Sequence, residues 1–415
     1  MENKITTTII DYGYDGEGVG KVNGKVCFVP YVLKDEQVEI RIVDEKKDFI
    51  YGKLEKVILP SHKRIKARCP YFADCGGCSY QHTDYVEELE IKRQLAERQL
   101  KKLNYNGEIK VHPSPNEYNY RNKIKLFVED KKIGLKRRNS NEISAIDNCD
   151  LAENLINKAL HTINIFVKTH DLYDKLENIV LRQEGENCLI NFYVKTPIDN
   201  NLMKQLYDNL GQNYGIYHTL GKKKMHICGL KFLETKEFSL SCRFSPYSFH
   251  QVNDYVCQKL YKRVLDEVNG KNVVNCYSGN GVLSGVLCQK CQKVTAIELG
   301  KSEHEEAEKL KQINKLQNLT NINGDCADVL PKIVNSFDTI IIDPPRKGVD
   351  KKVIQAIDNV DFKKLIYISC NIATLIRDLQ RLKDIKIECV ELFDMFARTG
   401  EYEMLAVITK DKKSL

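Results

Sequence analysis

A cysteine near the C-terminus stands where one strand is expected to end and a helix to begin. Residues 365–368 are apolar and mostly branched, a pattern typical of a strand buried on both faces. Cys370 follows this run, and a helical pattern starts near Ala373. A thiol at the carboxyl end of a parallel strand points into the crevice where open α/β sheets bind ligands. The helix N-terminus beyond it should favour the thiolate, so Cys370 is a candidate nucleophile.

A second group of cysteines has the spacing of a metal site. Cys69, Cys75 and Cys78 form a C-x5-C-x2-C pattern with two glycines inside the tight pair. These glycines let the backbone fold so that closely spaced sulfurs converge on one centre. Ligation by sulfur alone suits zinc or an iron–sulfur cluster, and both need a fourth ligand. Cys149 is the first candidate for that ligand and His82 the second.

A glycine loop and two acidic residues indicate a nucleoside-containing cofactor. Gly279 and Gly281 follow a strand at 273–276 and allow a ligand to approach the backbone closely. Glu298 ends the next strand, 17 positions beyond Gly281, where such folds place a ribose-binding carboxylate. Asp325 follows the third strand and suits an adenine amino group. This G-x-G form with two acids is more typical of S-adenosylmethionine folds than of dinucleotide folds.

The fourth strand of this region ends in Asp343, which two prolines follow directly. Prolines hold a loop extended and rigid. Asp343 is therefore expected at the carboxyl edge of the sheet, beside Cys370 on the next strand.

The elements that must position these groups form a regular α/β pattern from about residue 255. This alternation predicts an open, mainly parallel sheet with helices on both faces. The last two strands lack room for a crossover helix and should pair antiparallel at one edge. The expected strands are 273–276, 293–297, 319–322, 338–342, 365–369, 385–392 and 404–409.

The N-terminal half reads differently. Short strands at 5–10, 26–32, 37–43 and 49–57 predict a small closed barrel. Residues 84–104 predict an amphipathic helix with a solvated charged face, and strand-like and helix-like pieces alternate over 105–250. Tyr118, Tyr120 and Arg121, together with basic residues at 136–138, have a composition that suits single-stranded nucleic acid.

Composition narrows the class of protein. The chain has 415 residues, a net charge of +7 and 15 cysteines. The positive charge favours an anionic partner. No signal peptide and no apolar run long enough to span a bilayer are visible, so we expect a cytoplasmic protein whose cysteines are not disulfides. A second C-x-x-C, Cys288 and Cys291, has no partner pair and should serve packing.

Taken together, these motifs resemble the RNA 5-methyluridine methyltransferases. The most specific stretches are C-P-Y-F-A-D-C-G-G-C with Cys149, F-H-Q-V-N, I-I-D-P-P-R-K-G and I-S-C-N-I-A-T-L-I-R-D, and D-G-E-G-V-G-K-V resembles the TRAM barrel. The resemblance implies a TRAM-like RNA-binding barrel of OB type at 1–58. It implies an α+β central domain with the cysteine site at 59–250, and a Rossmann-like methyltransferase domain at 251–415.

The resemblance also implies ligands and roles. Cys370 would be the nucleophile and Glu403 the base, with Glu401 competing for that role. RNA would be the partner, ribosomal RNA favoured over transfer RNA, with no obligate protein partner and no membrane. A 4Fe–4S cluster would lie on Cys69, Cys75, Cys78 and Cys149. S-adenosylmethionine would lie near Gln251, Tyr277, Gly279, Gly281, Glu298, Asp325 and Asp343.

Three departures from the family pattern leave alternatives open. Asn275 stands where the family has aspartate, Ser278 where it has cysteine, and residues 397–401 replace a proline- and histidine-rich segment. One alternative is an RNA-binding iron–sulfur protein that has lost turnover. Another is a methyltransferase acting on a different position or base.

Overall fold

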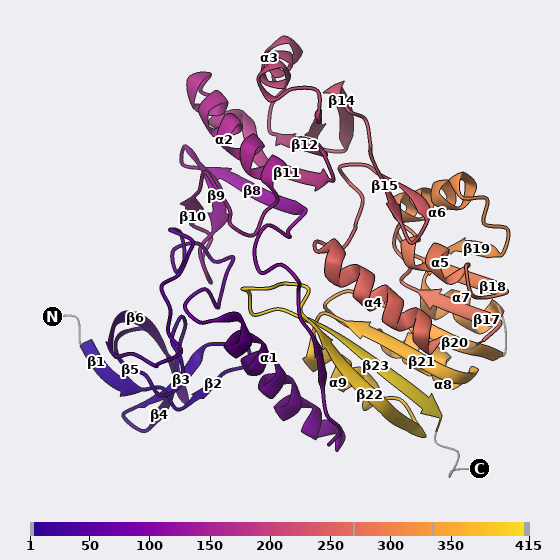
Figure 1. Cartoon of the computed structure of the whole chain (residues 1–415), viewed down its shortest axis with the longest axis horizontal. Coiled ribbons are helices and arrows are strands. Elements are labelled where there is room, and N and C mark those ends of the chain that lie inside the picture. Colours follow the sequence, from indigo (N-terminus) through magenta and orange to yellow (C-terminus); the bar gives the residue numbers. More distant parts are fainter. Residues whose placement is uncertain (1–3, 269, 334–335, 411–415) are drawn as a thin grey trace.

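The computed structural model describes residues 4–268, 270–333 and 336–410, which form three sheets of five or more strands and a short hairpin. At the N-terminus, six strands curl around a small apolar core that contains Ile9, Cys27 and Ile40 (Figure 1). The strand order is β1-β5-β6-β4-β3-β2. Two short strands, β2 and β3, lie between the expected strands at 5–10 and 26–32. The six strands are β1 Lys4–Thr8, β2 Asp11–Tyr12, β3 Gly18–Val22, β4 Lys25–Val29, β5 Gln37–Glu45 and β6 Phe49–Leu59.

The central region builds a seven-stranded sheet in the order β10-β9-β8-β11-β12-β13-β14. Alternate residues of its strands, such as Ile179, Leu181 and Ile190, pack with helices α2 (Asn154–Thr169) and α3 (Asn200–Leu210). The opposite face carries polar side chains. The strands are β8 Lys123–Glu129, β9 Lys132–Lys136, β10 Ile143–Ala145, β11 Leu176–Glu184, β12 Asn187–Val194, β13 Tyr214–Leu220 and β14 Lys223–Gly229. A hairpin of β15 (Leu233–Glu237) and β16 (Leu240–Phe244) follows.

The C-terminal region is the predicted layered α/β unit. Two apolar cores cover the two faces of its sheet: Val273 and Ile341 face α4, α5 and α6, whereas Val274 and Ile340 face α7, α8 and α9. Strands β17, β18, β19, β20 and β21 run parallel. Their bounds are β17 Asn272–Cys276, β18 Lys293–Glu298, β19 Leu319–Asn323, β20 Ser336–Ile342 and β21 Asp361–Ser369. The helices are α4 Asp254–Glu267, α5 Val282–Leu287, α6 Lys301–Ile313, α7 Cys326–Ile333, α8 Lys351–Asp358 and α9 Ile372–Leu379.

The far edge of this sheet differs from the expectation. Strands β22 (Ile385–Phe393) and β23 (Glu403–Lys410) do pair antiparallel. However, β7 (Lys110–His112) pairs parallel with β22 from outside, so the last two strands are not the edge. A segment nearly 300 positions earlier in the chain therefore completes the sheet and ties the N-terminal half to it.

Helix α1 (Tyr85–Leu100) corrects the expectation of a solvated helix. Ala96 and Leu100 enter the core around α8 and α9, and Lys92 is fully buried. The Lys92 ammonium lies 2.7 Å from a carboxylate oxygen of Glu88 and 2.7 Å from one of Asp394. Asp394 belongs to the loop between β22 and β23, which reaches toward the N-terminal segments in Figure 1. No helix among the described residues is long and apolar enough to cross a bilayer.

Removing one partner of this buried ion pair should destabilise the protein strongly. We expect Lys92→Ala to lower the free energy of unfolding by about 3–5 kcal/mol, because two carboxylates would stay buried without a cation. Lys101→Ala, an exposed lysine at the end of the same helix, should change it by less than about 0.5 kcal/mol. Denaturant titration of both variants checks this, and equal losses would contradict the role of Lys92.

Candidate active site

Three chemically active side chains meet at the carboxyl edge of the C-terminal sheet. Asp343 follows β20, Cys370 follows β21, and Glu403 opens β23. Because β21 and β23 pair antiparallel with Ser369 opposite Met404, Cys370 and Glu403 fall beside each other at the strand ends. Strands β20 and β21 are parallel neighbours, which brings Asp343 to the same edge. The sheet topology therefore brings together a thiol and two carboxyl groups from a stretch of sequence that spans 60 positions, from Asp343 to Glu403.

Burial sets the protonation of these groups. It raises the pKa of Asp343 to about 7 and that of Glu403 well above its usual value, with the Asp343 charge adding to the second shift. Burial also raises the pKa of Cys370 to about 11, and the Glu403 and Asp343 charges contribute. The expectation of a thiolate favoured by the helix N-terminus is therefore wrong for the ligand-free protein. Desolvation and two nearby carboxylates outweigh the weak field of a short helix.

Arg346 is the cation that opposes this shift. Its charge lowers the pKa of Cys370, and its guanidinium also bonds Glu401. Asn371 caps α9 by accepting from Ala373 N at 3.0 Å, and its Nδ2 donates to the Arg346 carbonyl oxygen at 3.4 Å. The loop carrying Arg346 is thus tied to the residue that follows Cys370.

Glu401 and Glu403 differ in their surroundings. Glu401 is exposed and paired with Arg346, whereas Glu403 is 5 % exposed and one of its oxygens has no hydrogen-bond partner. A buried carboxylate with a raised pKa is the stronger base once it ionises. Its free oxygen makes Glu403 the better proton acceptor beside Cys370.

The glycine loop has the shape of a ligand cradle. Gly279 has a φ of +55°, and a Cβ placed on it would meet no atom within 4 Å, so the backbone is open to a ligand there. Gly281 has a φ of +84° and lies tightly against Ala307, which anchors the loop on α6. The Glu298 carboxylate accepts from Gly279 N at 2.9 Å and from Gly300 N at 2.6 Å. Glu298 therefore also holds the loop closed around the space it borders.

The other residues expected to bind the nucleoside-containing cofactor differ in their surroundings. Gln251 is buried, and Tyr277 has a left-handed backbone with φ of 60°. Asp325 accepts from Ala327 N at 2.8 Å at the start of α7. The unusual Asn275 is buried, and its amide donates to Ser284 Oγ at 2.9 Å, which joins β17 to α5. Ser278 N donates to the Ile297 carbonyl oxygen at 3.0 Å, a bond that needs no particular side chain.

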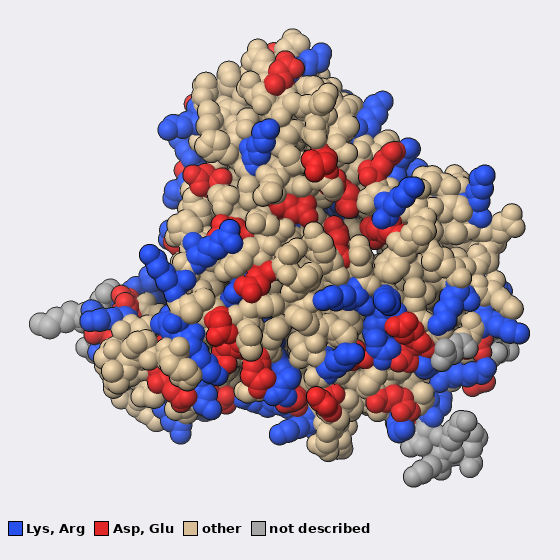
Figure 2. All heavy atoms as spheres, viewed as in Figure 1, with Lys and Arg blue, Asp and Glu red and all other residues tan. Residues whose placement is uncertain are grey.

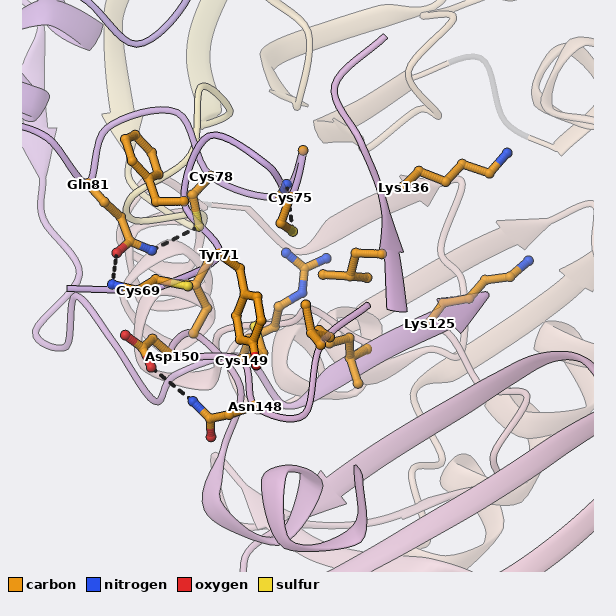
Figure 3. A pocket seen from close by; sticks show the side chains of 18 residues that line it. Cys69, Tyr71, Cys75, Cys78, Gln81, Lys125, Lys136, Asn148, Cys149 and Asp150 are labelled. Atoms are coloured by element: carbon orange, nitrogen blue, oxygen red, sulfur yellow. Dashed lines mark hydrogen bonds between the residues drawn. The ribbon is translucent and has the colours of Figure 1, made fainter. Parts of the chain in front are cut away.

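The four cysteines predicted as ligands line one cavity of about 250 Å³ (Figure 3). Cys69, Cys75 and Cys78 come from one loop, and Cys149 comes from the segment after β10. Gln81 Nε2 donates to Cys78 Sγ at 3.3 Å, and Gly77 N donates to Cys75 Sγ at 3.4 Å. His82 does not belong to the residues lining this cavity; it is buried and stacks on Phe72. Asp150 also lines the cavity, so the possible metal ligands around it are four thiols and one carboxylate.

The distances between the four sulfurs bear on which metal centre they could hold. Zinc at Zn–S distances of 2.3 Å would draw its sulfurs to within about 3.8 Å of one another. Within the described part of the chain, the one group of three metal-binding side chains within 4.8 Å of one another is Glu184, His250 and Asp254. No three of the cysteines are that close. Four thiols around one cavity suit either zinc or an iron–sulfur cluster.

Several functional neighbours give no signal in the sequence. Arg398 is 3 % exposed and donates to the Thr83 carbonyl oxygen at 2.7 Å, while its own carbonyl oxygen accepts from Ser79 N at 2.9 Å. Tyr120, expected in a nucleic-acid patch, is fully buried with its hydroxyl on the Ala397 carbonyl oxygen. That expectation is wrong for Tyr120, which braces the loop before Glu403. Cys291 is buried and Cys288 half-buried against the core, in agreement with a packing role.

Comparison with known proteins identifies related chains along almost the whole length. A family model described as tRNA (Uracil-5-)-methyltransferase matches residues 84–335 and 332–411, and a TRAM domain model matches residues 4–54. An uncharacterized RNA methyltransferase of Fusobacterium nucleatum is 30% identical over 434 residues, covering 96% of this chain and 94% of its own. One of Oceanobacillus iheyensis is 31% identical, covering 98% and 97%.

A solved structure shows the same architecture. The crystal structure of Pyrococcus abyssi tRNA (uracil-54, C5)-methyltransferase in complex with S-adenosyl-L-homocysteine superposes with a TM-score of 0.81 at 25% identity. The match covers 97% of this chain and 99% of that one.

The charges around Cys370 predict its reactivity in the ligand-free protein. Alkylation of Cys370 by iodoacetamide, followed site by site with mass spectrometry, should rise with pH toward a midpoint near pH 11, because the thiol has a pKa of about 11. Glu403→Gln removes a negative charge and should move the midpoint to lower pH. Arg346→Gln removes a positive charge and should move it higher. A wild-type midpoint below pH 8 would contradict this electrostatic account.

Proposed function

Because the chain belongs to the tRNA (uracil-5-)-methyltransferase family and is an S-adenosylmethionine-dependent RNA uracil-5 methyltransferase, we propose that it works through a covalent bond between Cys370 and the target uracil. The observation that carries this proposal is the meeting of one thiol, the buried carboxyl group of Glu403 and the half-buried carboxyl group of Asp343 at one sheet edge. Carbon 5 of uracil is a poor nucleophile, and a thiol beside a base is the chemistry that activates it.

The proposed steps assign one task to each side chain. The Cys370 thiol releases its proton to solvent and the resulting thiolate sulfur adds to carbon 6 of the ring, while the electron pair of the 5,6 double bond moves toward carbon 4 and its oxygen as an enolate. Carbon 5 is now electron-rich and accepts the methyl group; S-adenosylmethionine, when bound, supplies that group. Glu403 then takes the proton from carbon 5, the double bond re-forms, and the carbon 6–sulfur bond breaks. Arg346 favours the thiolate, and Asp343 orients the imide edge of the uracil.

S-adenosylmethionine would be held by Gln251, Asp343 and the loop at 276–281, together with Tyr277, Glu298 and Asp325. The open space above Gly279 and the carboxylate of Glu298 at its border support this assignment. We also propose the division of the chain into a TRAM barrel at 1–58, a central domain at 59–250 and a catalytic domain at 251–415. The target base must leave its stack to reach Cys370, and the first two domains would hold the RNA meanwhile.

Two classes of RNA are candidates for the substrate. The sequence resemblance favours ribosomal RNA, whereas the solved Pyrococcus abyssi neighbour is named for uracil 54 of transfer RNA. A map of 5-methyluridine in ribosomal and transfer RNA from cells lacking the gene decides between them. The site that loses its methyl group identifies the substrate.

We propose that the reaction takes place in the cytoplasm. This compartment is reducing and keeps the cysteines as thiols.

We propose that the four-cysteine cavity holds a 4Fe–4S cluster with a structural role. The four thiols around one cavity and the amide donors from Gln81 and Gly77 support this. Methyl transfer to uracil needs no electron transfer, so the cluster would shape the loop that carries it.

The nucleophile assignment predicts a clean separation of binding from turnover. Cys370→Ala should reduce transfer of labelled methyl groups to RNA to background, because Cys276, the thiol that ends β17 at the same edge, is fully buried in the core. Binding of S-adenosylmethionine, measured by calorimetry, should stay within about twofold of wild type. Retained methyl transfer would reject the covalent mechanism.

The base assignment predicts a trapped intermediate. Glu403→Gln should slow turnover by about 10²–10⁴-fold and leave the RNA attached to Cys370, because the carbon-5 proton has no acceptor. The adduct would appear as a slowly migrating band on a denaturing gel. Glu401→Gln is the matched control and should give little adduct. The opposite pattern would transfer the role to Glu401.

Elemental analysis tests the cysteine site independently of activity. Protein prepared without oxygen should contain about four iron atoms and four sulfides per chain. Cys149→Ser should lose them, whereas His82→Asn and Cys288→Ser should retain them. About one zinc atom and no iron in wild type would replace the cluster with a mononuclear site.

A further inference from the structure

A cavity of about 510 Å³ opens on the polar face of the central sheet and shares one lining residue, Lys125, with the four-cysteine cavity. Strands β8, β11, β12 and β14 form its floor, and Pro246 and Tyr247 form one wall. Its polar lining consists of three lysines, two tyrosines, one buried amide and one carboxylate. The proposed reaction steps use none of them.

One tyrosine is held as a rigid platform. The Tyr247 hydroxyl lies 3.1 Å from Thr219 Oγ1, and its ring packs edge-on against Tyr217 with centroids 6.1 Å apart. The Lys224 ammonium lies 4.0 Å from the centroid of the Tyr247 ring. Tyr193 lines the same cavity. Aromatic rings fixed in this way offer stacking surfaces to nucleic-acid bases at little cost in entropy.

The charge of the cavity is positive. Lys123, Lys125 and Lys224 line it, against the single carboxylate of Glu177. Lys123 is bound to a neutral acceptor, the Ser248 carbonyl oxygen at 3.2 Å, and burial together with Arg182 lowers the pKa of Lys123 to about 8. An anion in the cavity would give the Lys123 ammonium a charged partner and would raise the pKa of Lys123 again. Phosphate groups of RNA are such anions.

A buried amide adds an unmet hydrogen-bonding capacity. Asn178 lines the cavity, is 3 % exposed, and its Oδ1 has no hydrogen-bond partner. Its Nδ2 donates to Glu177 Oε1 at 3.3 Å. Buried polar atoms are nearly always paired, so an orphaned amide oxygen beside a cavity points to a ligand that donates a hydrogen bond. The edge of a base provides such donors.

The cavity is close to the proposed donor site along the chain. Tyr247 and Gln251 are four residues apart, so their Cα atoms lie within about 14 Å. The carbonyl oxygen of Phe249, between them, accepts from Asn280 Nδ2 of the glycine loop at 2.8 Å. One short segment thus walls the cavity and contacts the loop proposed to bind the methyl donor. An RNA strand entering the active site passes within reach of both.

A second cavity at the other end of β11 has the opposite charge. It is about 360 Å³ in volume, and its walls include Glu153, Glu184, Glu237 and Asp254. Figure 2 shows Asp and Glu side chains gathered on the face drawn there, where the central region meets α4. A polyanion is repelled from such a surface. The contrast directs RNA to the lysine-lined end of the sheet.

We propose that this cavity binds one nucleotide of the substrate RNA outside the target uridine, with its base stacked on Tyr247 and its phosphate on Lys125 and Lys224. The inference rests on the proposed function and extends it, because it gives the enzyme a second point at which the RNA is held. A nucleotide fixed here sets the register of the strand and so determines which uridine reaches Cys370.

The test measures RNA affinity and turnover separately. The probes are unmodified transfer RNA and ribosomal RNA from cells lacking the gene, with S-adenosylmethionine saturating. Tyr247→Ala should raise KM for the RNA about tenfold and leave kcat within about twofold, because a stacking platform is lost. Tyr247→Phe keeps the ring and should resemble wild type. The double variant Lys125→Gln with Lys224→Gln should reduce the slope of log affinity against log salt by about two.

A lysine on the opposite side of the same sheet provides the control. Lys168→Gln, on α2 across the opposite face, should leave KM and the salt slope unchanged. Unchanged KM, RNA affinity and salt slope in the Tyr247 and lysine variants, with wild-type melting temperatures, would overturn the proposal while methylation by wild type continues. If wild type transfers no methyl group, the proposed function fails, and filter binding of the same RNAs to the same variants still decides the cavity. Should Tyr247→Ala unfold, the double lysine variant carries the test.

Discussion

A thiol and two carboxyl groups meet at one edge of a sheet, where Glu403 is buried and Asp343 and Cys370 are half-buried, and negative charge on one opposes negative charge on the others. Each ionised carboxylate there makes the next ionisation harder, so Asp343 and Glu403 hold protons at pH values where exposed acids have lost them. The same field keeps Cys370 a thiol in the ligand-free protein. The resting enzyme is therefore protected from oxidation and alkylation, and Arg346 is placed where it can shift the balance toward thiolate.

A distant part of the chain fixes the loop before Glu403, and so keeps Glu403 close to Cys370 and Asp343. Asp394 binds the buried Lys92 of α1, and the Arg398 N–H donates to Glu88 at 2.7 Å. Tyr120 holds the Ala397 carbonyl oxygen. These contacts anchor the loop that contains residues 397–401. A buried ion pair is a weak source of net stability but a strict constraint on geometry.

The sequence predicts what local pattern and strand order determine. Alternating strands and helices place Asp343, Cys370 and the glycine loop at one edge, because parallel strands end on the same side. Three-residue β7 could not be predicted, since its pairing with β22 depends on contacts across 280 positions. Lys92 and Tyr120 were taken for surface residues because a charged or hydroxylated side chain reveals nothing of its buried partner. The thiolate expectation failed because a sequence shows a helix start but not the desolvation around it.

The loop that carries Cys78 is hydrogen-bonded to the loop that precedes Glu403. Cys78 is followed directly by Ser79 and Tyr80, and both backbone N–H groups donate to the Arg398 carbonyl oxygen, at 2.9 and 3.2 Å. Arg398 lies five residues before Glu403. The shape of the loop bearing Cys69, Cys75 and Cys78 therefore determines where the Arg398 backbone sits, and through it where β23 begins. A group that held the four sulfurs in place would therefore be connected to the start of β23 through this backbone path.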